Sequence, residues 1–286
     1  MPDTDLASLV RSAARRLADA GVPDPVVDAE LLVGHVLGRG RGEVQAAMVR
    51  GEGIAETDAA AFGALVERRS AREPLQHLTG TAPFRRLELA VGPGVFVPRP
   101  ETETVVQFAI DALLGAAEPE PIGVDLGTGS GAIALAMATE VPHARVFAAE
   151  LSPDAFAWAS RNVAGVENLV LVNADLADAF RELDGTASVV ISNPPYVPDA
   201  AVPRDPEVRL FDPALALYGG EDGLDVVRVL SVRARELLRP GGLLVIEHGE
   251  LQGEQIRGIL AADGWHAAAT HRDLTSRDRA TTALRP

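Results

Sequence analysis

About two thirds of the chain, towards its C-terminus, alternates short apolar runs with segments of helical periodicity, and this feature restricts the fold most. Five such runs are residues 122–126, 145–149, 169–172, 188–191 and 243–246. Strands that are separated by helices form βαβ units, in which the strands are parallel. The sequence therefore predicts an α/β domain on a mostly parallel sheet.

Residues 1–80 carry a different pattern, with apolar positions three and four residues apart and glycines between the repeats. The first repeat covers residues 4–20, the second begins at Asp24 and Pro25, and Thr57 is expected to cap a third. This spacing is that of one face of a helix. It predicts a small all-α N-terminal domain.

Residues 81–100 separate the two patterns. Alternating apolar positions and the segments 92–94 and 98–100, rich in glycine and proline, predict a hairpin or stiff connector there. Residues 101–286 then form the α/β domain.

The composition excludes several classes of protein. The 26 basic residues are all arginine, the acidic residues number 41, the net charge is −15, and cysteine is absent. Without lysine or cysteine the chain has no Schiff-base lysine, phosphate-loop lysine, thiolate nucleophile or cysteine-bound metal. The acidic charge argues against binding to nucleic acid or anionic lipid. With no apolar leader or spanning segment in the sequence, we expect a cytoplasmic protein.

A glycine-rich loop follows the first apolar run and opens a helix. After Asp125 and Leu126 it contains Gly127, Thr128, Gly129, Ser130 and Gly131. Glycines allow a tight turn and close approach of a ligand to the backbone N–H groups at the helix N-terminus. A plain strand–helix turn is the alternative.

Two further runs end in acidic residues at the edge where parallel strands finish. Glu150 follows the second run, where a carboxylate can accept hydrogen bonds from both hydroxyls of a ribose. Asp175 follows the third run and is a candidate acceptor for an adenine amine, with Leu176 as an apolar floor. The alternatives are a solvent-facing Glu150 and Asp175 as a helix cap.

The fourth run ends in Asn193, Pro194, Pro195 and Tyr196. Two prolines end a strand and form a rigid turn with few donors. Such a turn can aim the Asn193 side-chain oxygen and a proline carbonyl at one NH2 group, while Tyr196 packs on the planar group that carries it. The alternative is a loop in which Asn193 bonds its own backbone.

The glycine loop, Glu150 and the segment 193–196 together resemble class I S-adenosylmethionine-dependent methyltransferases that act on planar amino or amide nitrogens. From about residue 4 onward, the chain is similar to the peptide chain release factor glutamine N5-methyltransferases, the HemK or PrmC family. Segments that carry this similarity are residues 72–75 with Gly80 and Phe84, 97–103, 125–131, and 247–249 with Gln252.

The resemblance implies a doubly wound, Rossmann-like sheet of seven strands and a helical domain that engages the release factor. Residues 127–131 would hold the methionine end of S-adenosylmethionine, Glu150 its ribose, and Asp175 and Leu176 its adenine. Asn193 would contact cofactor and acceptor, and the other three residues of its turn would frame the glutamine amide of a Gly-Gly-Gln motif. The products are the methylated glutamine and S-adenosylhomocysteine, without a metal, and we expect a monomer.

Two other functions use the same features. An N6-adenine methyltransferase would also present a planar NH2 group to the 193–196 turn, and other protein amides are further acceptors. A nucleotide-binding module without catalysis would need the glycine loop but not that turn. The acidic charge disfavours a DNA substrate, since such enzymes usually need a basic surface.

Overall fold

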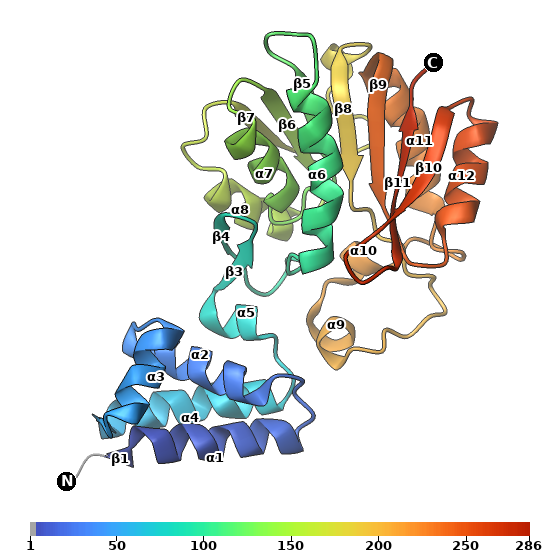
Figure 1. Ribbon diagram of the computed structural model, residues 1–286. Coiled ribbons are helices and arrows are strands. Elements are labelled where there is room, and N and C mark those ends of the chain that lie inside the picture. The colour runs from blue at the N-terminus through green and yellow to red at the C-terminus, as the bar shows by residue number, and fades with distance from the viewer. Residues whose placement is uncertain (1–3) are drawn as a thin grey trace. The chain divides into compact units, whose positions relative to one another are not determined.

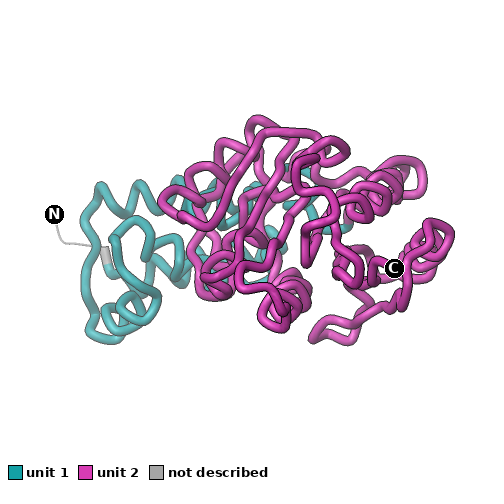
Figure 2. The backbone as a smooth tube through the Cα atoms, turned by 90° about the horizontal axis from the view of Figure 1, so that it is seen from above, with its two compact units in different colours: residues 1–81, 204–211 teal, residues 82–203, 212–286 magenta. Residues whose placement is uncertain are grey.

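The computed structural model describes residues 4–286, which fall into two compact units (Figures 1 and 2). The first, called here the helical unit, contains the chain up to Thr81 and also Arg204–Phe211. The second, the sheet unit, contains Ala82–Pro203 and Asp212–Pro286. The chain therefore passes between the units three times, after Thr81, Pro203 and Phe211.

The helical unit is built mainly from α-helices. They are α1 (Leu6–Asp19), α2 (Pro25–Leu37), α3 (Arg41–Val49), α4 (Glu56–Ser70), α5 (Leu75–Thr79) and, from the distant segment, α9 (Pro206–Phe211). Two short antiparallel strands, β1 (Thr4–Asp5) and β2 (Gly53–Ile54), join the start of α1 to the turn before α4. The helices α1, α2 and α4 pack on one another around Leu17, Leu32 and Phe62, which are almost fully buried.

The predicted helix ends in this unit are partly correct. Helix α1 begins one residue after Asp5, whose carboxylate accepts a hydrogen bond of 2.8 Å from the Ser8 N–H. The predicted cap at Thr57 is wrong, because α4 begins at Glu56 and Ala55 takes the cap position without a side-chain hydrogen bond.

The sheet unit contains a seven-stranded sheet in the order β10-β11-β9-β8-β5-β6-β7. Its strands are β5 (Ile122–Leu126), β6 (Arg145–Glu150), β7 (Leu169–Asn173), β8 (Ala187–Ser192), β9 (Leu238–Glu247), β10 (His266–Arg272) and β11 (Asp278–Leu284). Strands β5 to β9 pair in parallel, whereas β11 runs antiparallel to β9 and to β10. This sheet confirms the predicted α/β fold with a mostly parallel sheet.

Helices cover both faces of this sheet (Figure 1). One apolar core lies under α6 (Pro100–Leu114), α7 (Ala132–Glu140) and α8 (Pro153–Asn162). The other lies under α11 (Asp225–Leu237) and α12 (Gly253–Ala262). The remaining elements are the two-stranded sheet of β3 (Thr81–Phe84) and β4 (Leu87–Ala90), the 3-10 helix η1 (Arg181–Leu183) and α10 (Ala214–Leu217). Burial on both faces explains why the central strands read as continuous apolar runs.

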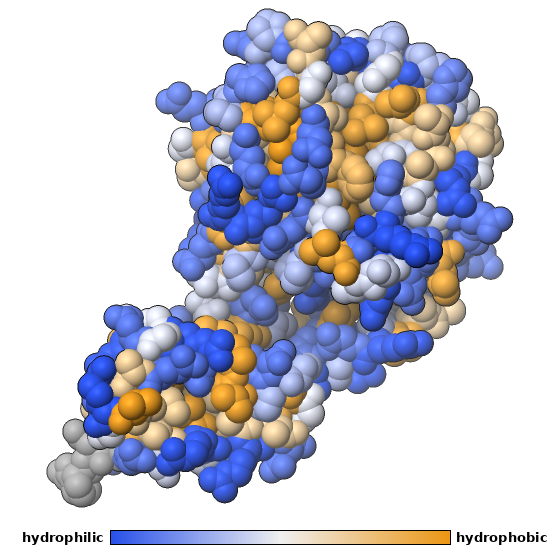
Figure 3. All heavy atoms as spheres, viewed as in Figure 1, coloured by the Kyte–Doolittle hydropathy of each residue, from blue (hydrophilic) through white to orange (hydrophobic). Residues whose placement is uncertain are grey.

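The visible surface carries both hydrophilic and hydrophobic residues. Figure 3 shows groups of hydrophobic residues between hydrophilic ones on this face. Within residues 4–286, no helix combines the length and the apolar character that crossing a membrane requires.

Candidate active site

The glycine loop joins β5 to α7 and is fixed against the end of β6. The N–H groups of Gly127 and Thr128 both donate to the Ala149 carbonyl, at 2.9 and 3.0 Å. Gly127 and Gly129 have φ angles of 77° and 59°, and a Cβ atom on either would meet no atom within 4 Å. The loop therefore needs glycine for its backbone conformation, and open space lies beside both residues.

Glu150 ends β6 and faces this loop. Its two carboxylate oxygens accept hydrogen bonds of 2.8 Å from the N–H groups of Gly129 and Ser152. Burial raises the pKa of Glu150, although these backbone donors act in the opposite direction. The strand-end acid is thus hydrogen-bonded to the glycine loop and is not the solvent-facing residue of the alternative interpretation.

Asp125, at the base of the loop, is a residue to which sequence reasoning gave no role of its own. Its carboxylate is fully buried and accepts from the Thr128 hydroxyl at 2.5 Å and the Ala134 N–H at 3.1 Å. Burial raises its pKa to about 7. The carboxylate links β5, the loop and α7, so that the loop is held from below.

The end of β7 lies beside Glu150. The Asn173 side chain donates to the Glu150 carbonyl at 2.6 Å. Asp175 is exposed and accepts from the Ala177 N–H at 2.9 Å, which caps a turn, and Leu176 is half-buried. Asp175 and Leu176 therefore follow the strand next to Glu150, at the same edge of the sheet.

The segment 193–196, called here the acceptor turn, follows β8 at this edge. The Ser192 hydroxyl donates to the Leu126 carbonyl at 2.5 Å, which ties the start of the acceptor turn to the start of the glycine loop. Asn193 is half-buried and Pro194 is buried. Sequence reasoning missed Ser192, although a hydroxyl inside an otherwise apolar strand is a recognisable exception.

Two glycines outside the predicted site allow the acceptor turn to pack closely on the following loop. A Cβ atom on Gly219 would stand 2.4 Å from the Pro195 carbonyl oxygen, and one on Gly223 2.4 Å from that of Tyr196. Any larger residue would displace the turn. The sequence shows a cluster of glycines after Tyr218. That these glycines pack against the acceptor turn could be found only from the structure.

Gln252 connects the acceptor turn to the end of β9. Its side-chain nitrogen donates to the Tyr196 carbonyl at 2.9 Å, and its side-chain oxygen accepts from the Gly249 N–H at 2.9 Å. The segment 247–249 with Gln252, noted in the sequence only as a shared pattern, therefore fixes the far end of the turn.

Tyr196 keeps its phenolic proton in this environment. Burial raises its pKa to about 12, and the negative charge of nearby Glu247 acts in the same direction. A phenol with this pKa is not a base at neutral pH. Tyr196 is therefore suited to packing against a planar group and to donating a hydrogen bond.

Glu247, the last residue of β9, is buried beside the acceptor turn. The preceding residue, Ile246, pairs with Ser192 of β8. Glu247 and Asn193, which come next in the two segments, therefore lie side by side at the ends of adjacent strands. One carboxylate oxygen, Oε2, is buried without a hydrogen-bond partner among the described residues. Burial raises the pKa of Glu247 to about 7. The Thr102 side chain, the positive charge of Arg279 and the Asn193 side chain lower it, whereas the charge of Glu101 raises it.

This raised pKa gives a prediction for stability. The Glu247 carboxyl has its ordinary pKa of 4.5 in the unfolded chain and a pKa of about 7 in the fold, so the unfolding free energy falls as pH rises between these values. The loss amounts to roughly 3 kcal/mol above pH 7. We expect Glu247→Gln to reduce the decrease in melting temperature between about pH 5 and about pH 8. Asp125 titrates in the same direction, so a smaller decrease should persist. An unchanged decrease in the variant would contradict the assignment.

His248 has a structural role. It is fully buried; its Nδ1 donates to the Gly249 carbonyl and its Nε2 accepts from the Thr281 hydroxyl, both at 2.8 Å. Burial lowers its pKa, which favours the neutral ring. These contacts occupy both ring nitrogens, so His248 supports the end of the sheet and is not part of a catalytic dyad.

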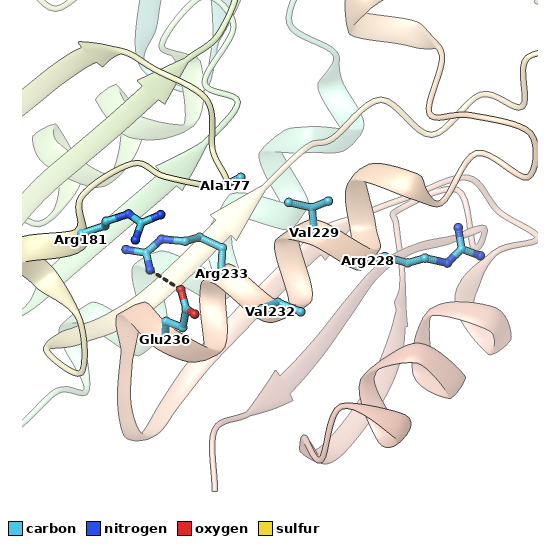
Figure 4. Close-up of a pocket in the computed structure, with 7 residues that line it drawn as sticks. All are labelled: Ala177, Arg181, Arg228, Val229, Val232, Arg233 and Glu236. Atoms are coloured by element: carbon cyan, nitrogen blue, oxygen red, sulfur yellow. Dashed lines mark hydrogen bonds and ion pairs between the residues drawn. The ribbon is translucent and has the colours of Figure 1, made fainter.

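A separate hollow of about 430 Å³ lies along α11 (Figure 4). Its lining includes Arg181, Arg228 and Arg233. Each of these three arginines already forms an ion pair, with Asp178, Asp222 and Asp184, respectively. The hollow therefore offers no unpaired cation to an anionic ligand.

Comparison with known proteins identifies the family. The helical unit matches the family model "PrmC N-terminal domain" over residues 8–80, and residues 88–227 match "Methyltransferase small domain". The release factor glutamine methyltransferase of Streptomyces coelicolor is 51% identical over 277 residues, which cover 96% of each chain. The chain belongs to the release factor glutamine methyltransferase family. The member from Bifidobacterium longum is 44% identical and covers 96% of this chain and 97% of its own.

The solved structures support the same fold. The hMettl16 catalytic domain, in complex with the MAT2A 3'UTR hairpin 6, is 15% identical with a TM-score of 0.54, covering 68% of this chain and 75% of that one. At this identity the likeness concerns the sheet and its helices alone. The release factor glutamine methyltransferase family thus accounts for both units of the chain, and the resemblance inferred from the sequence is confirmed.

Proposed function

We propose that the chain transfers a methyl group from S-adenosylmethionine to the side-chain amide nitrogen, N5, of the glutamine in the Gly-Gly-Gln motif of peptide chain release factors. The observation that carries this proposal is the placement of the acceptor turn beside the glycine loop. The 2.5 Å hydrogen bond between Ser192 and the Leu126 carbonyl fixes this placement. The members of the family are named for this reaction.

The glycine loop and its neighbours fit the cofactor. The open space beside Gly127 and Gly129 is suited to the methionine end, since both backbones can approach a ligand closely. Each oxygen of the Glu150 carboxylate accepts one N–H and keeps lone pairs for the ribose hydroxyls. Leu176 and Asp175 follow the adjacent strand, where the adenine would lie.

The acceptor turn fits a planar amide. Among residues 4–286, no N–H donates to the Pro194 carbonyl, whereas the Tyr196 carbonyl is already used by Gln252. The Pro195 carbonyl is packed against Gly219. We therefore assign the Asn193 side-chain oxygen and the Pro194 carbonyl as the two acceptors for the glutamine NH2 group.

These two acceptors would orient the amide nitrogen and partly localise its lone pair, which is otherwise delocalised into the carbonyl. When bound, S-adenosylmethionine supplies a methyl group that is already activated on a positively charged sulfur. Positioning is then the main task of the protein. We assign no general base, because the nitrogen becomes strongly acidic once methylated.

The helical unit is the candidate docking surface for the body of the release factor. An adenine acceptor would present a similar NH2 group, but the net charge of −15 disfavours a nucleic acid substrate. No observation on the sheet unit favours that alternative over a protein amide.

The proposal is tested with labelled S-adenosylmethionine and a purified release factor, compared with a variant whose motif reads Gly-Gly-Ala. We expect one added methyl group, located on the glutamine by mass spectrometry, and none on the variant. Equal labelling of both substrates, or no transfer despite tight cofactor binding, would overturn the proposed acceptor.

A further inference from the structure

The segment that leaves the acceptor turn becomes part of the helical unit. Ten positions after Tyr196 the chain enters α9 at Pro206, and the residues of α9 cluster with the helical unit rather than with the sheet unit. This placement could not be predicted from the sequence, because a helix of six residues is too short to show an apolar periodicity that indicates its partner.

A buried group of charges holds α9 in the helical unit. Glu207 is 8% exposed, and its Oε1 accepts hydrogen bonds of 2.8 Å from both Arg69 and Arg72. Its Oε2 accepts a second bond from Arg72 at 2.5 Å, so that Arg72 binds the carboxylate with two N–H groups. Arg69 also donates to the Asp28 carboxylate at 2.7 Å.

The electrostatics favour the charged state of Glu207. Burial alone raises its pKa, but hydrogen bonding of its side chain with Arg72, Asp205 and Arg69 lowers the pKa to about 2. The carboxylate therefore stays ionised above pH 4, and its attraction to the arginines is present throughout the neutral range. Charged hydrogen bonds of this bidentate type fix geometry as well as charge.

The residue that follows α9 is held within the sheet unit. Asp212 follows Phe211, the last residue of α9, and belongs to the sheet unit. Its carboxylate is buried and accepts from Arg99 at 2.7 Å. At the start of the segment, directly after the acceptor turn, the Val197 N–H donates to the Leu217 carbonyl at 2.8 Å. The Asp199 N–H also donates to the Gly220 carbonyl, at 2.9 Å, so only residues 200–205 separate these contacts with the sheet unit from α9.

We propose that Glu207, clamped by Arg69 and Arg72, is a positioning residue that couples the helical unit to the acceptor turn. The inference rests on the proposed function: residues 197–205 join the acceptor turn to α9, so a substrate that docks on the helical unit is linked to the turn through this segment while the clamp keeps α9 in that unit. A short Gly-Gly-Gln peptide lacks the body of the release factor that would dock on the helical unit, so its methylation should not depend on this clamp. The clamp thus raises the effective concentration of the glutamine only for an intact release factor.

The test compares Glu207→Gln with Glu30→Gln in the full-length chain. Glu30 is a matched control, since it is buried in the same unit and its carboxylate accepts from Arg41 at 2.6 Å and from Gln45 at 3.0 Å, both residues of α3. We expect Glu207→Gln to raise the KM for the intact release factor about 10-fold. Its kcat/KM for the peptide and its affinity for S-adenosylmethionine should match those of Glu30→Gln. An equal loss of activity on both substrates, or none on either, would overturn the coupling.

Two further measurements keep the test independent of folding and of the proposed substrate. Arg72→Lys keeps the charge but loses the bidentate geometry, so we expect a smaller KM effect with an unchanged melting temperature. Hydrogen exchange needs no substrate, and we expect faster exchange at residues 197–213 in Glu207→Gln but not in Glu30→Gln. Unchanged exchange would refute the clamp. Failure of the parent chain to methylate any release factor would instead refute the proposed function.

Discussion

Replacing Asn193 with alanine is expected to lower kcat for methyl transfer by about 100- to 1000-fold, the usual effect of losing one positioning group. The substitution removes one of the two acceptors for the substrate NH2 group and leaves the Pro194 carbonyl in place. The glycine loop and Glu150 are unchanged, so binding of S-adenosylmethionine should weaken only modestly. Single-turnover transfer and calorimetric titration of the cofactor measure the two effects separately.

Asn168→Ala provides the matched control. Asn168 is also half-buried, and its side chain donates to the backbone carbonyls of Ala138 and Ala144, each at 3.0 Å. It precedes β7, at the sheet edge opposite the acceptor turn. We expect this variant to lose stability but to keep kcat. Turnover at the parental rate in Asn193→Ala would refute the role of Asn193.

Gly129→Val is expected to lower the affinity for S-adenosylmethionine by about 100-fold, which corresponds to about 3 kcal/mol. The φ of 59° is unfavourable for valine, and its side chain would occupy the open space where we place the methionine end. Because no protein atom lies within 4 Å of the added Cβ, the fold itself has room for it. The affinity is read from equilibrium binding, without any methyl acceptor.

Gly165→Val separates backbone strain from loss of the cofactor site. Gly165 has a φ of 83° and also has open space around its Cβ position, but it lies in the turn between α8 and β7 and is not part of the glycine loop. Both variants should melt at similarly reduced temperatures. If both also bind the cofactor equally well, the methionine end does not lie beside Gly129.

The central strands could be predicted from the sequence because they are buried on both faces. The predicted run 122–126 coincides with β5, and the runs for β6 and β7 end one residue early. The strands β10 and β11 were missed as apolar runs. Their sequences are rich in alanine, threonine and charged residues, since they form the antiparallel end of the sheet.

The parts of the site whose conformation depends on neighbouring residues in the sequence could be predicted. Contacts between residues far apart in the sequence could not. The φ angles of Gly127 and Gly129 agree with the tight turn that the glycine spacing indicated. The contacts of Gly219 and Gly223 with the acceptor turn depend on how the following loop folds back. The ion pair between Glu207 and Arg69 joins residues 138 positions apart. The spacing of apolar residues along the sequence does not indicate such a contact.

That separation also sets the order in which the chain can fold during synthesis. At about 5–20 residues per second, Glu207 is made roughly 7 to 28 s after Arg69. Until then the helical unit lacks α9, and Arg69 has Asp28 as its acidic partner. Strands β5 to β8 are translated in that interval. The first part of the chain to emerge from the ribosome is therefore completed only after four of the five parallel strands of the sheet have been made.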